Sequence, residues 1–234
     1  MPVKPVSKAV TELLGTYFLV LTIGMVVIEP GAGALAPLAI GAGLMVMVYA
    51  GGHISGAHYN PAVTLAVLLR GKATTRDLPG YWIAQIVGAL AAAVTVGFFK
   101  GDAAVVGITP PLGQAFVAEA LFTFALCFVI LNVATTRGTE GNSYYGLAIG
   151  FTVTAGAYAV GGISGGAFNP AVAIALVVLG IAEPGMLLVY FVAQFAAAAG
   201  AALVFNALDL GADKPTTATP AEQDALRPAA ATDR

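Results

Sequence analysis

Long apolar blocks separated by short polar loops dominate this sequence. A block of about 20 residues is the length that crosses a hydrocarbon core about 30 Å thick as an α-helix. Charged residues make up 9% of the chain, against about 25% in ordinary soluble domains, so polar surface is too scarce to coat a soluble globule. The sequence therefore predicts an all-α membrane protein surrounded by lipid. The expected spanning helices cover residues 9–28, 35–52, 80–99, 113–134, 144–161 and 185–208.

Two further apolar segments, residues 61–70 and 170–180, are too short to span the bilayer, and each begins at an Asn-Pro pair. A helix of ten residues is only about 15 Å long, half the thickness of the membrane core. We expect both segments to be re-entrant half-helices. A membrane tolerates the irregular backbone around them only where it is buried in protein or lines a wet cavity.

An internal repeat organises the chain. A shift of 109 residues places Asn60-Pro61-Ala62 on Asn169-Pro170-Ala171, and a shift of 107 places Glu12 on Glu119. Each half contains three spans, so the two halves must have opposite topology in the membrane. Inverted repeats place their functional site near the midplane, where broken helices meet. We expect one channel domain, 1–208, with repeats at about 9–99 and 113–208, and a disordered tail, 209–234.

The loop charges predict the orientation of the bundle. In a six-span topology, one side receives nearly all the basic residues, and the other receives only Lys100. Because cytoplasmic loops carry an excess of Lys and Arg, both termini should be cytoplasmic, with the protein in the plasma (inner) membrane. The basic residues of the cytoplasmic side are Lys4, Lys8, Arg70, Lys72, Arg76, Arg137 and the three in the tail.

The two Asn-Pro-Ala motifs predict a pore. Proline suits the first turn of a helix, and asparagine before it is a favoured cap, so each motif starts a half-helix. Two opposed half-helices bring their positive ends together at the membrane centre, which is a barrier to cations. The amides of Asn60 and Asn169 are expected to remain free to donate hydrogen bonds to a solute. A narrow passage for small uncharged molecules follows.

The stretch His53-Ile54-Ser55-Gly56-Ala57-His58-Tyr59-Asn60-Pro61-Ala62-Val63-Thr64 closely resembles the first signature of the major intrinsic proteins, the aquaporins and aquaglyceroporins. The resemblance extends over about residues 9–206. It implies a bundle of six tilted helices plus two half-helices, assembled as a homotetramer with one pore in each subunit. No cofactor is implied.

The resemblance also implies roles for polar residues within the apolar spans. An ionisable residue in a spanning segment is costly and is a functional candidate by default. The family's equivalents of Glu12 and Glu119 accept hydrogen bonds from the re-entrant loops, a supporting role that we favour over a proton relay. The family places His53 beside the pore, although a histidine bonded to backbone is the alternative. His58 is interpreted as structural. No Cys, Asp or Glu accompanies these histidines, so we expect no metal site.

The sequence departs from the family at the outer constriction. Family members usually have arginine directly after the second Asn-Pro-Ala, and this chain has Val172. Spacing from the two asparagines places Ile40, Ala157 and Gly166 at the other filter positions. Such a filter is wide and apolar, so solutes larger than water should fit. A filter with valine resembles those of certain bacterial aquaglyceroporins linked to arsenic resistance, which suggests arsenite or methylated arsenicals as solutes.

Passive flow of small neutral solutes, such as polyols, urea and metalloid hydroxides, with or without water, is therefore the leading hypothesis. The alternatives are a water-selective aquaporin, an ion-coupled secondary transporter, and a structural membrane protein with a closed pore. An enzyme is not expected, because no nucleophile and base can be paired from these motifs. A net charge of −2 without a basic stripe gives no reason to expect a nucleic-acid partner.

Overall fold

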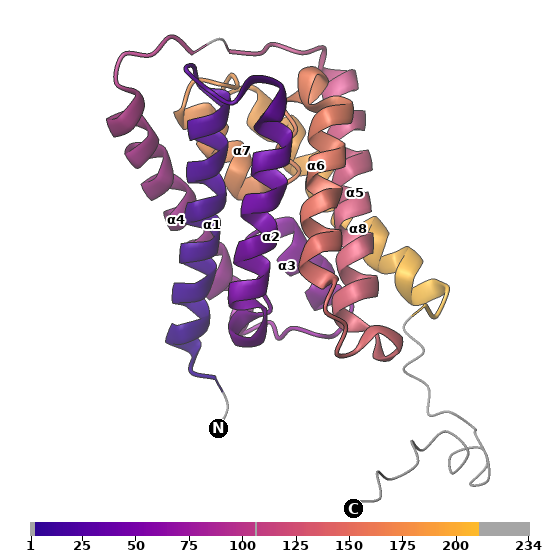
Figure 1. Cartoon of the computed structure of the whole chain (residues 1–234). Helices are drawn as coiled ribbons and strands as arrows, with labels where there is room; N and C mark the ends of the chain where they lie inside the picture. Colours follow the sequence, from indigo (N-terminus) through magenta and orange to yellow (C-terminus); the bar gives the residue numbers. More distant parts are fainter. Residues whose placement is uncertain (1–2, 106, 211–234) are drawn as a thin grey trace, which may run out of the picture.

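The computed structural model describes residues 3–105 and 107–210, which form a bundle of α-helices (Figure 1). Six of the described helices are long and apolar enough to cross a membrane, which confirms the predicted number of spans. Their bounds are α1 Pro5–Val27, α2 Ala36–Ser55, α4 Asp77–Lys100, α5 Leu112–Thr135, α6 Tyr145–Ser164 and α8 Met186–Ala207.

The ends of the helices differ from the expected ends by a few residues. The first helix, α1, begins at Pro5, four residues before the predicted start, because its polar first turns continue the same helix. The second, α2, runs on to Ser55 and stops where Gly56 adopts a left-handed backbone with φ of 87°. Glycine takes this conformation without the steric cost that a side chain imposes. The tail predicted from residue 209 lies, from residue 211 onward, outside the described residues.

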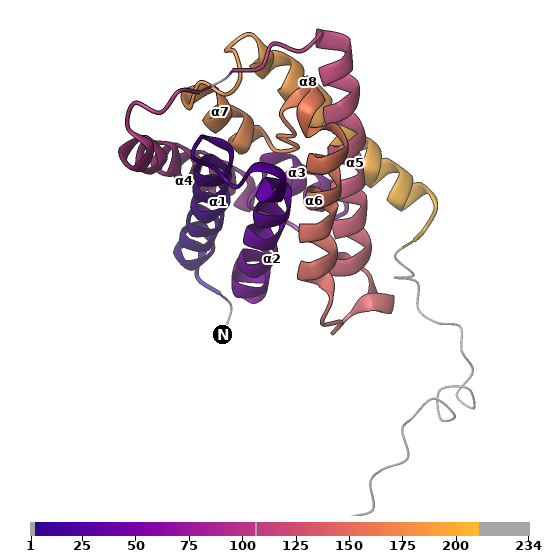
Figure 2. The same ribbon diagram turned by 45° about the horizontal axis from the view of Figure 1, so that its top comes forward.

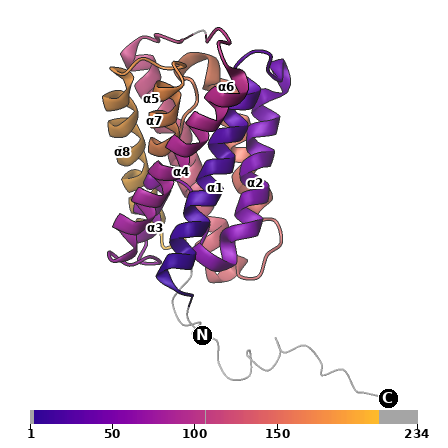
Figure 3. The ribbon, with the colours of Figure 1, turned by 90° about the vertical axis from the view of Figure 1, so that its left-hand side faces the viewer.

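Two short helices, α3 Pro61–Leu69 and α7 Pro170–Val178, are the re-entrant half-helices. They begin at the two Asn-Pro pairs, and Figure 3 shows α7 in the upper half of the bundle and α3 in the lower half. Each packs against a span of the other repeat, α3 against α8 and α7 against α4. The opposed half-helices therefore meet near the middle of the bundle, as the inverted repeat predicts.

The two ends of the bundle differ in their loops. The end that carries the start of α1 also carries the loops after α3 and α5, with Lys8, Lys72 and Arg137, and is called here the basic end. At the opposite end, the segment that leads to α5 crosses the top of the bundle near α7 (Figure 2). The amide of Ile108 donates to the carbonyl of Ile181 over 2.9 Å, which fixes this segment to the loop that follows α7.

The two repeats contact each other closely where α2 crosses α6. A Cβ atom on Gly150 of α6 would lie 2.4 Å from the carbonyl oxygen of Gly41 in α2, far inside van der Waals contact. Small residues at such crossings let helix backbones approach one another in a membrane. The crossing thus brings the half of the chain that carries Asn60 against the half that carries Asn169.

Candidate pore and its lining

The two asparagines cap the half-helices as the sequence predicts. Asn60 has extended backbone dihedrals, and its Oδ1 accepts from the amides of Ala62 at 2.9 Å and Val63 at 3.4 Å. Asn169 repeats this geometry at the start of α7, with the same two distances to its own following residues. Each side-chain carbonyl is therefore committed to its own helix, and only the amide nitrogen can face elsewhere.

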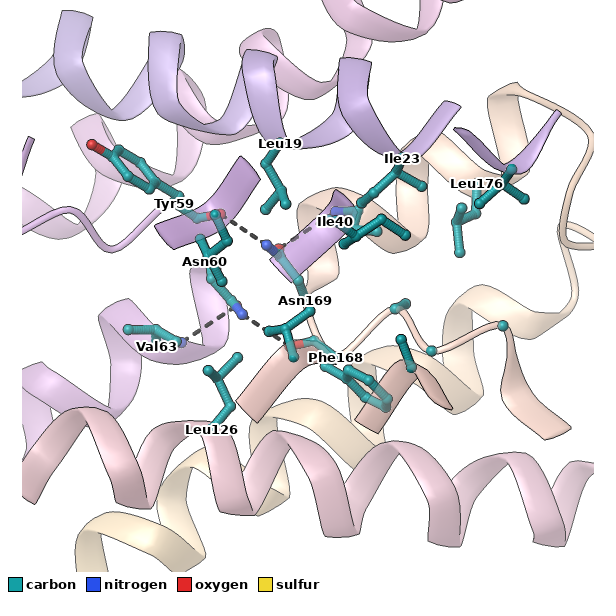
Figure 4. A pocket seen from close by; sticks show the side chains of 18 of the residues that line it. Leu19, Ile23, Ile40, Tyr59, Asn60, Val63, Leu126, Phe168, Asn169 and Leu176 are labelled. Atoms are coloured by element: carbon teal, nitrogen blue, oxygen red, sulfur yellow. Dashed lines mark hydrogen bonds between the residues drawn. The ribbon is translucent and has the colours of Figure 1, made fainter. Parts of the chain in front are cut away.

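Those amide nitrogens are partly engaged, which corrects one expectation. Asn60 Nδ2 donates to the carbonyl of Phe168 over 2.9 Å, and Asn169 Nδ2 donates to the carbonyl of Tyr59 over 2.8 Å (Figure 4). The prediction that both amides are free was wrong for one of the two hydrogens on each nitrogen. The reciprocal bonds join the two loops to each other, and one hydrogen per amide is left to face the passage.

Glu12, at 0% exposure within α1, holds the first re-entrant loop. Its carboxylate accepts two backbone N–H groups, from His58 at 2.9 Å and from Tyr59 at 2.6 Å. It also accepts from the hydroxyl of Ser55 at 2.6 Å and from the Gln85 amide at 2.8 Å. A buried carboxylate with four donors is well satisfied, so its interactions fix the loop that leads into Asn60.

Glu119 of α5 makes the matching set of bonds in the second repeat. It accepts from the amides of Ala167 at 3.0 Å and Phe168 at 2.7 Å. The hydroxyl of Ser164 and the amide of Gln194 complete the set at 2.7 and 2.8 Å. The two glutamates therefore accept from the same four kinds of donor. Both carboxylates lie at the re-entrant loops rather than at the passage.

The residue before each asparagine adopts a costly backbone conformation. Tyr59 has φ of 49° and Phe168 has φ of 47°, values that are uncommon for bulky side chains. Such a strained conformation persists where several surrounding contacts hold the backbone in place. Here the amide of each residue is held by a glutamate, and its carbonyl accepts from the opposite asparagine. The strained turn thus aims each carbonyl at the other loop.

A narrow cavity of about 60 Å³ runs past both asparagines. Since one water needs roughly 10–15 Å³ measured in this way, the cavity has room for about four waters. Leu19 and Ile23 of α1 lie on one side of the pair and Leu126 of α5 on the other (Figure 4). The cavity wall also contains all four residues that spacing placed at the filter, Ile40, Ala157, Gly166 and Val172.

The histidines lie at the basic end of the bundle. His53 is exposed and lines a wide cavity of about 650 Å³ that opens there, next to the narrow passage. His58 is buried, and its Nδ1 lies 3.2 Å from the hydroxyl of Thr64 in α3. The hydroxyl of Thr64 also accepts from Gln85, so His58 belongs to the hydrogen-bonded support of the first loop.

The sequence analysis did not predict the apolar residues of the long helices that line the passage. Leu19 and Ile23 of α1 have counterparts Leu126 and Ile130 in α5, and all four line the cavity. The offset of 107 residues that relates Glu12 to Glu119 also relates these pairs. Reading the repeat along the whole helix, beyond its glutamates, would have found them.

Comparison with known proteins agrees with this geometry. The model of the family described as Major intrinsic protein matches residues 2–157 and 116–231. Aquaporin NIP1-4 of Oryza sativa subsp. japonica is 38% identical over 212 residues, covering 87% of this chain and 77% of that protein. Glycerol uptake facilitator protein-like 6 of Lactiplantibacillus plantarum is 41% identical over 174 residues, covering 70% and 80%.

A solved structure shares the fold. The aquaglyceroporin from Plasmodium falciparum superposes with a TM-score of 0.73, covering 87% of this chain and 96% of that one. Its sequence is 21% identical to this chain, so the likeness concerns the arrangement of the helices.

Proposed function

The chain belongs to the major intrinsic protein family, and from this premise we propose that it is a passive channel for small uncharged solutes larger than water. The solutes we propose are glycerol-like polyols, urea, and uncharged metalloid hydroxides such as arsenite or methylated arsenicals, with water as a companion. As a family member with six apolar spans, the protein is an integral, multi-pass membrane channel and not an enzyme.

The observation that carries the proposal is the apolar wall around the asparagine pair. Ile40, Ala157 and Val172 supply hydrocarbon, and Gly166 adds no side chain, so the proposed filter has neither a fixed charge nor a bulky ring. An ion that enters this cavity loses its hydration without gaining a partner of opposite charge. A small neutral molecule loses far less, because the amides and the loop carbonyls replace part of its hydration.

The half-helices add a second barrier to cations. The N-termini of α3 and α7 both lie at the asparagine pair, and each helix end has a partial positive charge of roughly +0.5. This field opposes cations and hydronium at the centre of the passage. Because the filter has valine where the family usually has arginine, cations are excluded by the half-helix ends and the apolar wall alone.

Flux measurements separate a channel from the alternatives. In proteoliposomes, we expect the initial rate of glycerol entry to rise linearly with the gradient and to be the same in sodium and potassium buffers. A secondary transporter would saturate and depend on the coupling ion. Vesicles no more permeable than protein-free vesicles to every solute tried would indicate a closed, structural protein, and either result contradicts the proposal.

We also propose that the basic end faces the cytoplasm in the plasma (inner) membrane, so that both termini are cytoplasmic. The support is the excess of Lys and Arg in its short loops. In a Cys127→Ser background, a membrane-impermeant thiol reagent added to intact cells should label Asp102→Cys and spare Thr74→Cys. The opposite labelling pattern contradicts this orientation.

The subunits are proposed to assemble as a homotetramer through the side of the bundle formed by α2 and α6. Within one chain, 22% of the 18-residue apolar stretch that contains most of α2 is buried. The corresponding stretches of α1, α4, α5 and α8 are each 39% buried. The α2 side therefore offers the most uncovered surface to a second copy. Native mass spectrometry from detergent should give four times the subunit mass, whereas a monomer, dimer or trimer contradicts this assembly.

A further inference from the structure

The inverted repeat gives every filter residue a counterpart on the other side of the asparagine pair. A shift of 109 residues converts the outer set into an inner set. The outer set is Ile40, Ala157, Gly166 and Val172, and the inner set, in the same order, is Ile149, Val48, Ala57 and Val63.

The inner set occupies the boundary between two cavities. Val63 lines the narrow central cavity, together with both asparagines. Val48, Ala57 and Ile149 line the wide cavity of about 650 Å³ at the basic end. Of the described residues, Ile130 is the one that lines both. All four residues of the outer set, by contrast, line the central cavity.

Side-chain size and burial both distinguish the inner set from the outer set. Val48 is larger than its mate Ala157, and Ala57 is larger than its mate Gly166, whereas isoleucine and valine stand at the other two positions of both sets. All four inner residues are buried, with exposures from 1% for Val63 to 6% for Ala57. In the outer set, only Val172 is buried to this degree, and the other three are half-buried. The inner set therefore combines larger side chains with less uncovered surface than the outer set.

We propose that Ile149, Val48, Ala57 and Val63 form an inner constriction that sets the largest solute the channel passes, in place of the outer filter. The inference rests on the proposed function, since it concerns which residues limit that flow. An apolar ring discriminates by size, because a solute too large to pass must displace packed side chains. The outer set then admits solutes to the passage, and the inner set decides which of them are small enough to leave it at the basic end.

Reciprocal substitutions test the proposal, because they exchange the sizes of the two sets. Val48→Ala gives the inner position the alanine of its outer counterpart, and Ala157→Val gives the outer position the valine of its inner counterpart. The probes are water, urea, glycerol and the larger polyol erythritol, measured by light scattering in proteoliposomes of the full chain. We expect Val48→Ala to raise glycerol and erythritol permeability several-fold, with a smaller change for water. Ala157→Val enlarges the outer side chain only to the size of its inner counterpart, so it should lower glycerol permeability only slightly.

A second variant that widens the inner set controls for any effect of lost packing at the buried Val48. Ala57 has φ of 51°, a conformation that favours glycine, so Ala57→Gly widens the inner set while relieving the backbone. It should raise glycerol permeability in the same direction as Val48→Ala. Protein content and melting temperature in detergent, measured for each variant, normalise the rates per folded channel.

The result that overturns the inner constriction is an unchanged size limit in Val48→Ala and Ala57→Gly, combined with a severalfold loss of glycerol permeability in Ala157→Val. That pattern places the limit at the outer filter. Failure of the proposed function looks different, because wild type then passes water alone. If Val48→Ala still admits glycerol in that case, the inner constriction stands and the proposed solutes do not.

Discussion

Replacing Val172 with arginine lowers glycerol and urea permeability by about tenfold or more, which corresponds to roughly 1.4 kcal/mol of added barrier. Val172 is 2% exposed and lines the narrow cavity beside Asn169. Arginine is far longer than valine, and its guanidinium must remain hydrated or bonded within an apolar wall. It therefore narrows the aperture and orders water in it. Stopped-flow light scattering of proteoliposomes measures the change directly.

The matched control is Val172→Ala, which removes volume from the same position and adds no charge. It should keep or raise the permeability to glycerol. If Val172→Arg conducted glycerol at the wild-type rate with equal protein content, the side chain at position 172 would not face the passage. Equal losses in the arginine and alanine variants would point to damaged packing rather than to a narrowed aperture.

Replacing Glu119 with leucine removes the acceptor of four hydrogen bonds and unfolds the second loop. Each buried donor left without a partner costs roughly 1–3 kcal/mol, so the total reaches several kcal/mol. Membrane proteins recover part of such losses when alternative partners are found. We expect a melting temperature in detergent well below that of wild type, together with loss of flux. Removing a single donor in Ser164→Ala should have a much smaller effect on both.

Glu119 also distinguishes support from proton transfer. If Glu119 only supports the loop, Glu119→Leu should lower the melting temperature and the flux together. A Glu119→Leu protein with the wild-type melting temperature and no flux would show that the carboxylate acts in transport itself. A variant with wild-type stability and flux would show that the hydrogen bonds to Ala167 and Phe168 contribute little.

The sequence was sufficient for most of the fold, for physical reasons that can be traced. Spans follow from apolar length, and both half-helices follow from an Asn-Pro start on a segment too short to cross. Glu12 and Glu119 stand out because a carboxylate within a spanning segment is costly. The starts of α3 at Pro61 and α7 at Pro170 agree with the predicted starts, since proline fixes the first turn.

The reciprocal bonding of the two loops could not be predicted in this way. Asn60 reaches the carbonyl of Phe168 only because that residue has a positive φ and because the two half-helices meet end to end. The inverted repeat predicts that the half-helices meet, but the positive φ has no signal in the local sequence, since bulky residues seldom adopt such dihedrals. The start of α1 at Pro5 lies before the predicted start at residue 9 for a simpler reason, because the helix continues beyond the apolar block into polar residues.

A permeability panel on wild-type proteoliposomes shows whether the chain passes neutral solutes larger than water. The panel compares water, urea, glycerol and arsenite at neutral pH, where arsenite is uncharged, with protein-free vesicles as the reference. We expect at least one of the three larger solutes to cross much faster than in protein-free vesicles. Accelerated passage of water alone would contradict it and favour a water-selective channel.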